Sequence, residues 1–226
     1  MSRHLTLGDD EIIRCVVAGQ TALFEILMRR HNPRVFRTTR AILRDDAEAE
    51  DAMQDTYVRA FMSLATFEGR ALFSTWLTRI AVYEALARVR RRRQFDLLSS
   101  SEELEAESTT AIPFAGQSPE QNAADVETST LVERAVDALP DGFRAVFMLR
   151  AVEEMSTAET AECLGIPEDT VKTRLHRARA LLQKTLFEHA EVVLPAPPFA
   201  FHLSRCDRVV TGVLRRIAAG ERATGA

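Results

Sequence analysis

Cysteine is scarce in this sequence, and the three cysteines present follow no pattern with a structural use. Cys15, Cys163 and Cys206 are far apart and odd in number, and no two have the spacing of a zinc site or a disulfide framework. We therefore expect neither a metal nor another cofactor. A reducing, cytoplasmic location fits this use of cysteine best.

Long apolar runs are also missing. The first residues contain no signal-peptide-like apolar run, and no stretch of the 226-residue chain is apolar and long enough to cross a bilayer. No run of alternating apolar residues predicts a sheet. A hydrophobic content of 46% still suffices for two small helical domains, so we expect an all-α fold without membrane insertion.

Positive charge is absent from residues 94–130, which contain eight acidic residues and no Lys or Arg. This composition predicts a flexible acidic linker over 96–130 between helical domains at 9–95 and 131–188. The linker should keep the two domains apart and repel DNA by like charge. Because the net charge of the whole chain is -4, any affinity for nucleic acid must come from local basic patches.

A third segment, residues 189–226, is predicted to contain an accessory amphipathic helix. Pro195, Pro197 and Pro198 break the chain before it. Its apolar residues recur with helical period: Leu203, Cys206, Val209, Val210, Val213, Leu214 and Ile217. Such a helix needs a surface on which to bury this stripe, and it could either regulate access to the other domains or simply pack on them.

Residues 156–185 have the punctuation of a helix-turn-helix. Ser156 and Glu159 have the spacing of a capping box at a helix start. Gly165 suits a sharp turn, and Pro167 suits the beginning of a second helix near residue 168. Ala161 is small where the two helices should approach closely.

The second helix of this motif should present its polar residues outward. Val171, Leu175 and Ala178 are spaced to face inward. The remaining surface belongs to Lys172, Thr173, Arg174, His176, Arg177 and Arg179. A lone basic helix is more often only a solvated face, but the cap, the turn and the paired helix favour binding to duplex DNA.

The first domain contains an amphipathic helix with an acidic outer side. Its inward stripe consists of Met53, Tyr57, Phe61 and Leu64, and its outer side carries Glu50, Asp51, Gln54 and Asp55. The like-charge pair of Asp51 and Asp55 costs an isolated helix roughly 0.2–0.5 kcal/mol, so this side favours a cationic partner. Acidic residues near a helix N-terminus are an equally good structural explanation.

A glycine-containing loop at Gly69 leads into a further helix rich in aromatic residues and arginine. Phe73, Trp76 and Tyr83 fall on one broad side, and the helix ends in the basic run 88–93. The rings could be core residues. Alternatively, aromatic rings beside arginines bind single-stranded nucleic acid, since bases stack on the rings while cations hold the backbone.

Several of these segments together resemble bacterial sigma factors of the extracytoplasmic-function (ECF) class in the sigma-70 family. The matching residues are Ala49-Glu50-Asp51 through Phe61, Phe67-Glu68-Gly69, Thr75-Trp76-Leu77, Arg79-Ile80-Ala81 and Leu139-Pro140 before the helix-turn-helix. The resemblance covers roughly residues 9–188. It implies a dissociable subunit of RNA polymerase with a region 2 helical bundle and a region 4 helix-turn-helix.

The resemblance also implies partners and residue roles. Region 2 would bind the clamp helices of core RNA polymerase, region 4 would approach its flap, and promoter DNA and an anti-sigma factor would be further partners. Polymerase contacts would come from Glu50, Asp51, Gln54, Asp55 and Arg59. Minus-10 DNA would be opened and bound by Phe67, Arg70, Phe73, Ser74, Trp76, Arg79, Tyr83, Arg90 and Arg91. Minus-35 DNA would be read by Lys172, Thr173, Arg174, His176, Arg177 and Arg179, with Arg174 and Arg177 dominant.

The sequence departs from the family pattern at three places. Tyr83 stands where many members carry Asn, Ala87 occupies an often polar position, and the segment 189–226 is additional to the two regions.

Two other classes of protein remain open: a sigma mimic that titrates an anti-sigma factor, and a helix-turn-helix repressor that binds a palindrome as a dimer. An enzyme is least expected, because neither a nucleophile-base grouping nor a metal cluster is recognisable.

Overall fold

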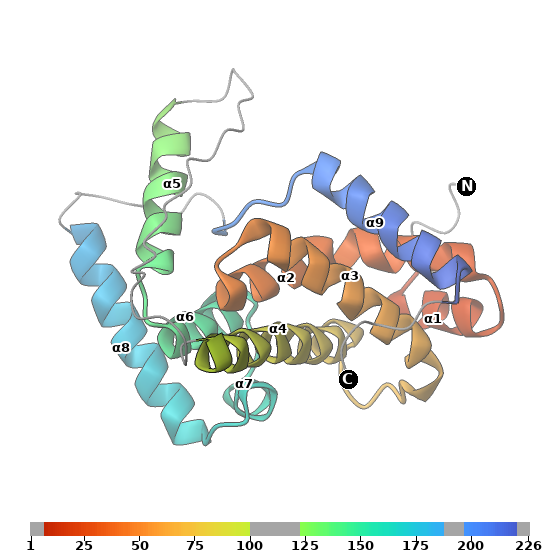
Figure 1. The fold of residues 1–226 in the computed structure, drawn as a ribbon, viewed down its shortest axis with the longest axis horizontal. Helices are drawn as coiled ribbons and strands as arrows, with labels where there is room; N and C mark the ends of the chain where they lie inside the picture. The colour runs from red at the N-terminus through yellow and green to blue at the C-terminus, as the bar shows by residue number, and fades with distance from the viewer. Residues whose placement is uncertain (1–6, 100–122, 188–196, 221–226) are drawn as a thin grey trace.

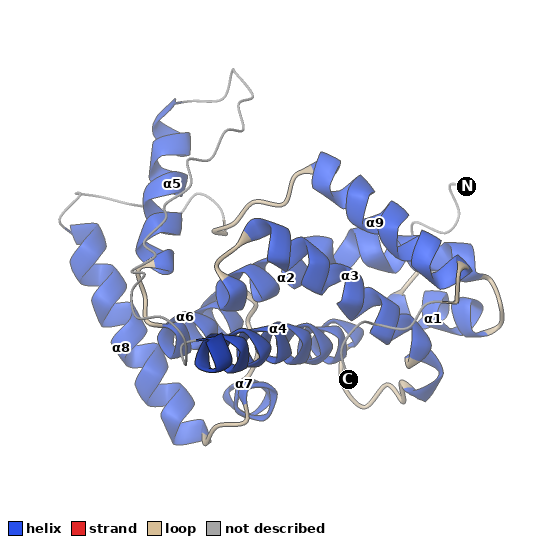
Figure 2. Ribbon diagram, in the orientation of Figure 1, coloured by secondary structure: helices blue, strands red, loops and turns tan. Residues whose placement is uncertain are grey.

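The computed structural model describes residues 7–99, 123–187 and 197–220. Every regular element in these three ranges is helical, and none of them contains a strand (Figure 2). The prediction of an all-α fold is therefore confirmed. The helices form two units, and a last helix lies across the first of them (Figure 1).

The first unit is a bundle of helices from the amino-terminal part of the chain. Its helices are α1 (Asp9–Val17), α2 (Phe24–Leu43), α3 (Asp46–Met62) and α4 (Phe73–Ser99), with short 3-10 turns η2 (Thr21–Leu23) and η3 (Leu64–Thr66). Arg44 adopts the left-handed conformation that ends α2, and the Asp45 side chain accepts a hydrogen bond from the Glu48 backbone N–H to begin α3. Helices α2 and α3 are therefore joined by a tight turn at Arg44 and Asp45.

The core of the first unit contains the inward stripe predicted for α3. Met53 and Tyr57 are wholly buried, Leu64 is buried, and Phe61 is partly buried against them. The ring of Phe24 meets the rings of Tyr57 and Phe61 edge-on, with centroids 6.2 and 5.3 Å away. Burying this stripe fixes the rotation of α3 and so decides which of its residues face outward.

The second unit contains the helix-turn-helix. It consists of α5 (Ala123–Asp137), α6 (Asp141–Phe147), the short π-helical turn η4 (Met148–Val152), α7 (Thr157–Leu164) and α8 (Glu168–Phe187). The predicted linker is partly helical, because α4 continues to Ser99 and α5 begins at Ala123. The rest of the linker, 100–122, lies outside the described residues.

The two units are packed together, so the expectation that they stand apart is wrong for this structure. In the bundle α6 packs on α2, and α7 packs on α4 (Figure 1). Arg144 of α6 is wholly buried and donates to the carbonyl of Ala41 in α2. Glu153, 2% exposed, forms ion pairs with Arg34 and Arg37 of α2 at 3.0 and 2.5 Å. These contacts join residues more than 100 positions apart in the chain, so local sequence patterns could not reveal them.

The last helix, α9 (Leu203–Ala218), lies against α3 and α2 (Figure 1). Its amphipathic character is as predicted, since Cys206, Val209, Val210 and Val213 are buried against the bundle. Leu203 is 82% exposed, because it begins the helix beyond the edge of the contact. The first unit thus supplies the surface that the predicted apolar stripe required.

Candidate nucleic-acid interface

The helix-turn-helix has the capping and turn geometry predicted from its sequence. The Ser156 hydroxyl accepts a hydrogen bond from the Glu159 backbone N–H at 3.1 Å, and the Ser156 N–H donates to the Glu159 carboxylate at 2.8 Å. Gly165 ends α7 with a φ of 64°, a left-handed conformation that glycine adopts without strain. The hydrogen bonds from Ser156 lower the pKa of Glu159 below its ordinary value of 4.5.

A small core holds α7 and α8 at a fixed angle. Val171 is wholly buried, and Ala161 and Val146 are buried beside it. Leu175 is partly buried against the same cluster, and Ala178 is wholly buried in the main core. The inward side predicted for α8 is therefore confirmed, and its opposite side faces away from the protein.

The outward side of α8 carries most of the residues predicted to read DNA. Five of the six are exposed: Lys172, Thr173, His176, Arg177 and Arg179. Lys172 pairs with Asp169 at 3.0 Å, an exposed pair that a phosphate could replace at little cost. Arg174 is half-buried and extends over Gly142 of α6, where an added Cβ would lie 2.9 Å from its Nη1. Arg174 is thus turned toward α6 within its own unit, whereas Arg177 is exposed on the outward side.

The loop before α4 combines a buried aromatic cluster with an exposed tip. Phe67, Phe73 and Trp76 lie with ring centroids 5.3–5.7 Å apart. Phe73 is only 3% exposed and is part of the core, so its ring is not presented to a base in this conformation. Leu72, which the sequence analysis did not select, is 75% exposed at the rim of a hollow of about 750 Å³ that Arg70 and Ser74 also line.

The arginines of α4 differ in how freely they could contact DNA. Arg90 and Arg91 are exposed at its far end. Arg79 forms an ion pair with Glu162 of α7 at 2.6 Å, which ties it to the second unit. Tyr83 is 48% exposed, and the guanidinium of Arg59 lies 5.2 Å from the centre of its ring. By helical spacing Trp76, Arg79, Tyr83 and Arg90 share one side of α4, and α7 packs on α4 at Arg79.

The predicted acidic side of α3 is largely occupied. Asp51 is exposed, whereas Glu50 and Gln54 are half-buried and Asp55 is 2% exposed. Asp55 forms ion pairs with Arg88 of α4 and with Arg216 of α9. We refer below to Glu50, Asp51, Gln54 and Asp55 as the α3 face.

Arg59, the remaining predicted polymerase contact, points toward α4. It forms an ion pair with Glu84, a wholly buried carboxylate that also has Arg88 3.8 Å away. Burial raises the pKa of Glu84 above its ordinary value of 4.5, although both arginines act in the opposite direction. Arg59 therefore serves the packing of α3 on α4 in this conformation.

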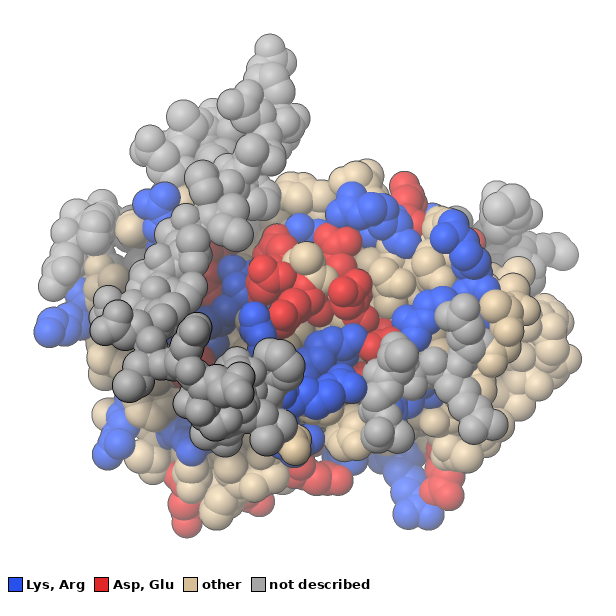
Figure 3. All heavy atoms as spheres, viewed as in Figure 1, with Lys and Arg blue, Asp and Glu red and all other residues tan. Residues whose placement is uncertain are grey.

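The cations that cover the α3 face come from α9, and the sequence analysis did not select them. Arg205 and Arg208 pair with Glu50 at 2.7 and 2.9 Å, and Arg216 pairs with Asp55 at 2.8 Å. On the face drawn in Figure 3, acidic side chains gather over α2 and α3, and basic side chains lie beside them along α9. Their spacing of i, i+3 and i+11 places them on one side of a helix, a signal that was present in the sequence.

The described residues contain no group of three His, Cys, Asp or Glu side chains arranged to hold a metal ion. Among the helices that the structure describes, none has the length and apolar character needed to cross a membrane.

Comparison with known proteins gives matches over both units. The family model described as Sigma-70 region 2 matches residues 27–95, and the one described as Sigma-70, region 4 matches residues 129–182. The ECF RNA polymerase sigma factor SigW of Bacillus subtilis is 32% identical over 177 residues, which cover 77% of this chain and 94% of SigW. The ECF RNA polymerase sigma factor SigM of Mycobacterium tuberculosis is 35% identical over 179 residues, 79% of this chain and 85% of SigM.

The fold is also similar to solved structures. The sigma factor RpoE of Bartonella quintana, in complex with the anti-sigma factor NepR, superposes with a TM-score of 0.54 at 24% identity, over 72% of this chain and 93% of RpoE. Helix α9 lies beyond both matched regions. The chain belongs to the ECF RNA polymerase sigma factors of the sigma-70 family, which direct promoter-specific initiation of transcription and are not enzymes in the catalytic sense.

Proposed function

We propose that the first unit, residues 9–95, docks on core RNA polymerase through the α3 face and Arg59. The proposal is supported by a run of acidic and amide side chains on one side of a rigid helix, whose opposite side is fixed by the buried residues Met53 and Tyr57. Cationic helices of the polymerase clamp would complement this charge. Complementary charges of this kind accelerate encounter and set the register of binding.

The loop before α4 and the exposed side of α4 would bind the minus-10 element and help to open it. The hollow beside Leu72 is lined by both apolar and polar groups, as a base removed from the stack requires. Exposed arginines at 70, 90 and 91 would hold the strand backbone. The full set of proposed minus-10 contacts is Phe67, Arg70, Phe73, Ser74, Trp76, Arg79, Tyr83, Arg90 and Arg91.

The second unit, residues 131–188, would read the minus-35 element with α8. In helix-turn-helix proteins the first residues of the second helix meet base edges while neighbouring residues hold phosphates. Arg177 is exposed on this side and has the donor geometry for bidentate pairing with guanine. Lys172, Thr173, Arg174, His176 and Arg179 complete the proposed minus-35 set, with the acidic segment 96–130 joining the two units.

We further propose that the protein acts in the cytoplasm, has no catalytic site of its own and is held by an anti-sigma factor of unknown identity. Of two proteins with a similar fold, the sigma factor RpoE was solved in complex with the anti-sigma factor NepR, and CnrH in complex with the cytosolic domain of CnrY. The observation that carries the whole proposal is the presence in one chain of an exposed basic α8 and an acidic α3 face.

The test is in vitro transcription with purified cognate core polymerase on fragmented genomic DNA, with RNA 5′ ends mapped with and without the protein. We expect new start sites that share two spaced upstream elements. The protein is supplied at concentrations where its association with core polymerase is verified by co-elution. Absence of new starts from that verified complex would contradict the proposal, and binding of a palindrome without polymerase would favour a repressor instead.

A further inference from the structure

We propose that helix α9 occupies the α3 face in place of the polymerase, so that the chain holds itself in a state that cannot dock. The inference relies on the proposed function for the identity of the face. It concerns a segment outside both regions that the sigma-70 family models match. Its observations are the contacts that α9 makes with α3 and α2, together with those that Phe199 and Phe201, just before the helix, make with α5 and α2.

Charge complementarity is the first of these observations. The residues of α9 that face α3 form one stripe at positions i, i+3, i+7 and i+11, namely Arg205, Arg208, Gly212 and Arg216. Two of these arginines bind the Glu50 carboxylate, and the third binds Asp55. A basic helix laid on these carboxylates is the same chemistry that the face would offer to a cationic helix of the polymerase.

The close approach at Gly212 is the second observation. A Cβ at this position would lie 2.8 Å from Gln54 Oε1 and 3.2 Å from Gln54 Cδ. Glycine is less favourable than alanine in a helix interior, because it loses more backbone freedom on folding. Its position directly over Gln54 allows α9 to lie against α3, and three of the four residues of the α3 face, all except Asp51, then contact α9.

Apolar burial makes the contact more than a set of surface ion pairs. Four residues of α9 are at most 6% exposed, namely Cys206, Val209, Val210 and Val213. Before the helix, the centre of the Phe201 ring lies 5.3 Å from the centre of the Phe36 ring of α2. The Arg205 guanidinium also contacts the Phe36 ring and lies 4.2 Å from its centre. Arg208 is exposed and its ion pair contributes little, whereas the pairs of Arg205 and Arg216 are largely buried; the apolar residues therefore hold α9 in place while the arginines fix its register.

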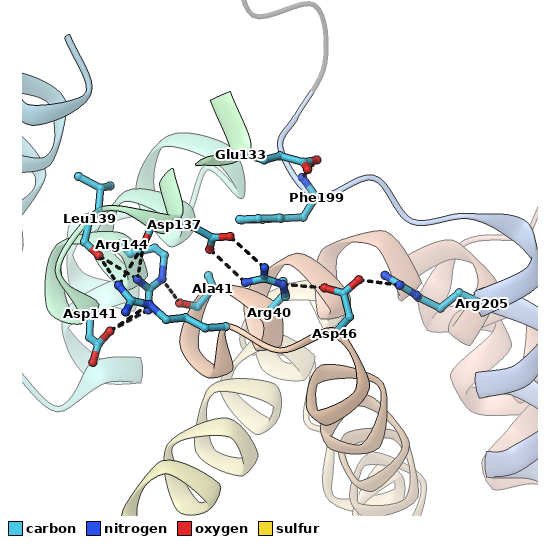
Figure 4. Close-up of polar contacts among 11 residues, drawn as sticks. Arg40, Ala41, Asp46, Glu133, Asp137, Leu139, Asp141, Arg144, Phe199 and Arg205 are labelled. Atoms are coloured by element: carbon cyan, nitrogen blue, oxygen red, sulfur yellow. Dashed lines mark hydrogen bonds and ion pairs between the residues drawn. The ribbon is translucent and has the colours of Figure 1, made fainter. Parts of the chain in front are cut away.

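The same segment also connects the two units. Figure 4 shows a chain of alternating charges in which Asp137 of α5 binds Arg40 of α2, Arg40 binds Asp46 of α3, and Asp46 binds Arg205 of α9. The Glu133 carboxylate of α5 accepts the backbone N–H of Phe199 at 2.8 Å, and Arg40 lies 4.9 Å from the centre of the Phe199 ring. Displacing the tail would therefore free the α3 face and also remove contacts that hold the second unit on the first.

Only molecules whose α3 face is free can bind core polymerase. When α9 occupies the face in some molecules, the apparent affinity for polymerase therefore falls in proportion to the fraction that remains free. If α9 is docked in nine molecules of ten or more, core polymerase should bind about tenfold or more weakly than it does to a face left open. The proposal therefore predicts a measurable difference between a chain with α9 held in place and the same chain with α9 free to leave.

The direct experiment locks α9 to α3 in the full chain with Gln54→Cys and Gly212→Cys, because a Cβ at 212 would lie against the Gln54 side chain. Oxidised and reduced samples of this one protein are compared for affinity to core polymerase, with the 54–212 crosslink verified by peptide mass. We expect oxidation to weaken binding at least about tenfold and reduction to restore it. Gly212→Cys alone is the control for oxidation of the native cysteines. Equal affinity of the two forms, or failure of the pair to close, would overturn the proposal.

A release experiment gives the opposite perturbation. Arg205→Glu with Arg208→Glu places two carboxylates against Glu50, and faster hydrogen exchange across α9 reports its departure. We expect tighter binding to core polymerase. Arg215→Glu makes one such charge reversal at an exposed position on the same helix and, as a control, should leave the affinity as it is. Faster exchange without tighter binding would refute the occupant role of α9.

Asp51→Lys distinguishes failure of this inference from failure of the proposed docking face. Asp51 belongs to the α3 face but remains exposed. If Asp51→Lys weakens core binding while the crosslink has no effect, the face docks polymerase and only the inference about α9 is wrong. If Asp51→Lys has no effect in either the reduced double-cysteine protein or the wild type, the docking face itself is wrong and the inference is overturned with it.

Discussion

Arg177 and Arg174 carry the same charge and lie three residues apart on α8, yet the structure gives them different surroundings. Arg177 is exposed, whereas Arg174 is half-buried across Gly142. Both were expected to dominate minus-35 recognition. The spacing in the sequence could indicate the outward side of α8, but it could not show that a neighbouring helix would present a glycine over which one of the arginines lies.

At the residue scale, we predict that Arg177→Ala weakens use of minus-35-dependent promoters. Loss of a bidentate contact to a base costs about 1–3 kcal/mol, or roughly a fivefold to 150-fold reduction in affinity for the promoter. Transcription from a mapped promoter measures this effect, together with the affinity for core polymerase, which should not change. Lys184→Ala removes an exposed cation from the same helix and is the matched control. Wild-type promoter use by the Arg177 variant would refute the assignment.

At the element scale, the helices that sequence could place are those whose ends are determined locally. Ser156, Glu159 and Gly165 act within a few residues of themselves, so α7 and the start of α8 were predictable. The apolar stripe of α9 was equally visible. Its binding surface was not, because the pairing of Arg205 with Glu50 joins residues far apart in the chain. For Phe73 the sequence left a core role and a DNA contact both open, since a pattern of aromatic residues does not distinguish them, and in this conformation its ring is buried.

The capping box of α7 contributes to the stability of the folded protein. Ser156→Ala removes one of the two reciprocal hydrogen bonds and should destabilise the protein by about 1 kcal/mol at pH 7. The Glu159 pKa should rise only part of the way toward its ordinary value of 4.5, because the Ser156 backbone N–H, the larger cause of the lowering, remains while the side-chain contribution is lost. Chemical denaturation of both proteins and NMR titration of Glu159 measure these effects.

The pH dependence of that difference follows from the sign of the shift. A carboxylate whose pKa is lower in the folded state contributes stability above its unfolded value, and this contribution is lost as pH falls through the folded value. The difference between wild type and Ser156→Ala should therefore be largest above pH 4.5 and shrink below it. Ser204→Ala, at an exposed serine of α9, controls for loss of a hydroxyl. A difference that stays constant on acidification would contradict the role of Glu159.

At the scale of the whole molecule, the packed arrangement cannot be the one that reads a promoter. The two elements are named for positions about 25 base pairs apart, or about 85 Å of B-form DNA at 3.4 Å per base pair. A compact chain of this length has a radius of gyration of only about 17 Å. The two units must therefore separate when both elements are bound. The sequence could indicate two units and a joining segment, but it could not show that Arg144 and Glu153 hold them together in the free protein.

Glu153 offers the most direct test of this closed arrangement. Its buried carboxylate neutralises Arg34 and Arg37 of α2. Glu153→Gln would leave these two arginines without their negative partner. Because both arginines retain some exposure and can turn to water, we expect a cost to closure of about 1–2 kcal/mol, less than for a fully buried pair. That cost corresponds to a roughly fivefold to thirtyfold larger open population.

Spin labels at the exposed positions Ala47 of α3 and Gln183 of α8 would report the separation of the two units by pulsed electron resonance. Glu153→Gln should add a population at longer distance, and Glu154→Gln, the same chemical change at the neighbouring exposed residue, should leave the distribution as in the wild type. If the closed arrangement limits promoter binding, the Glu153 variant should also bind a two-element promoter complex more readily with core polymerase. An unchanged distance distribution in Glu153→Gln would mean that apolar packing of α6 on α2, rather than this carboxylate, keeps the molecule closed.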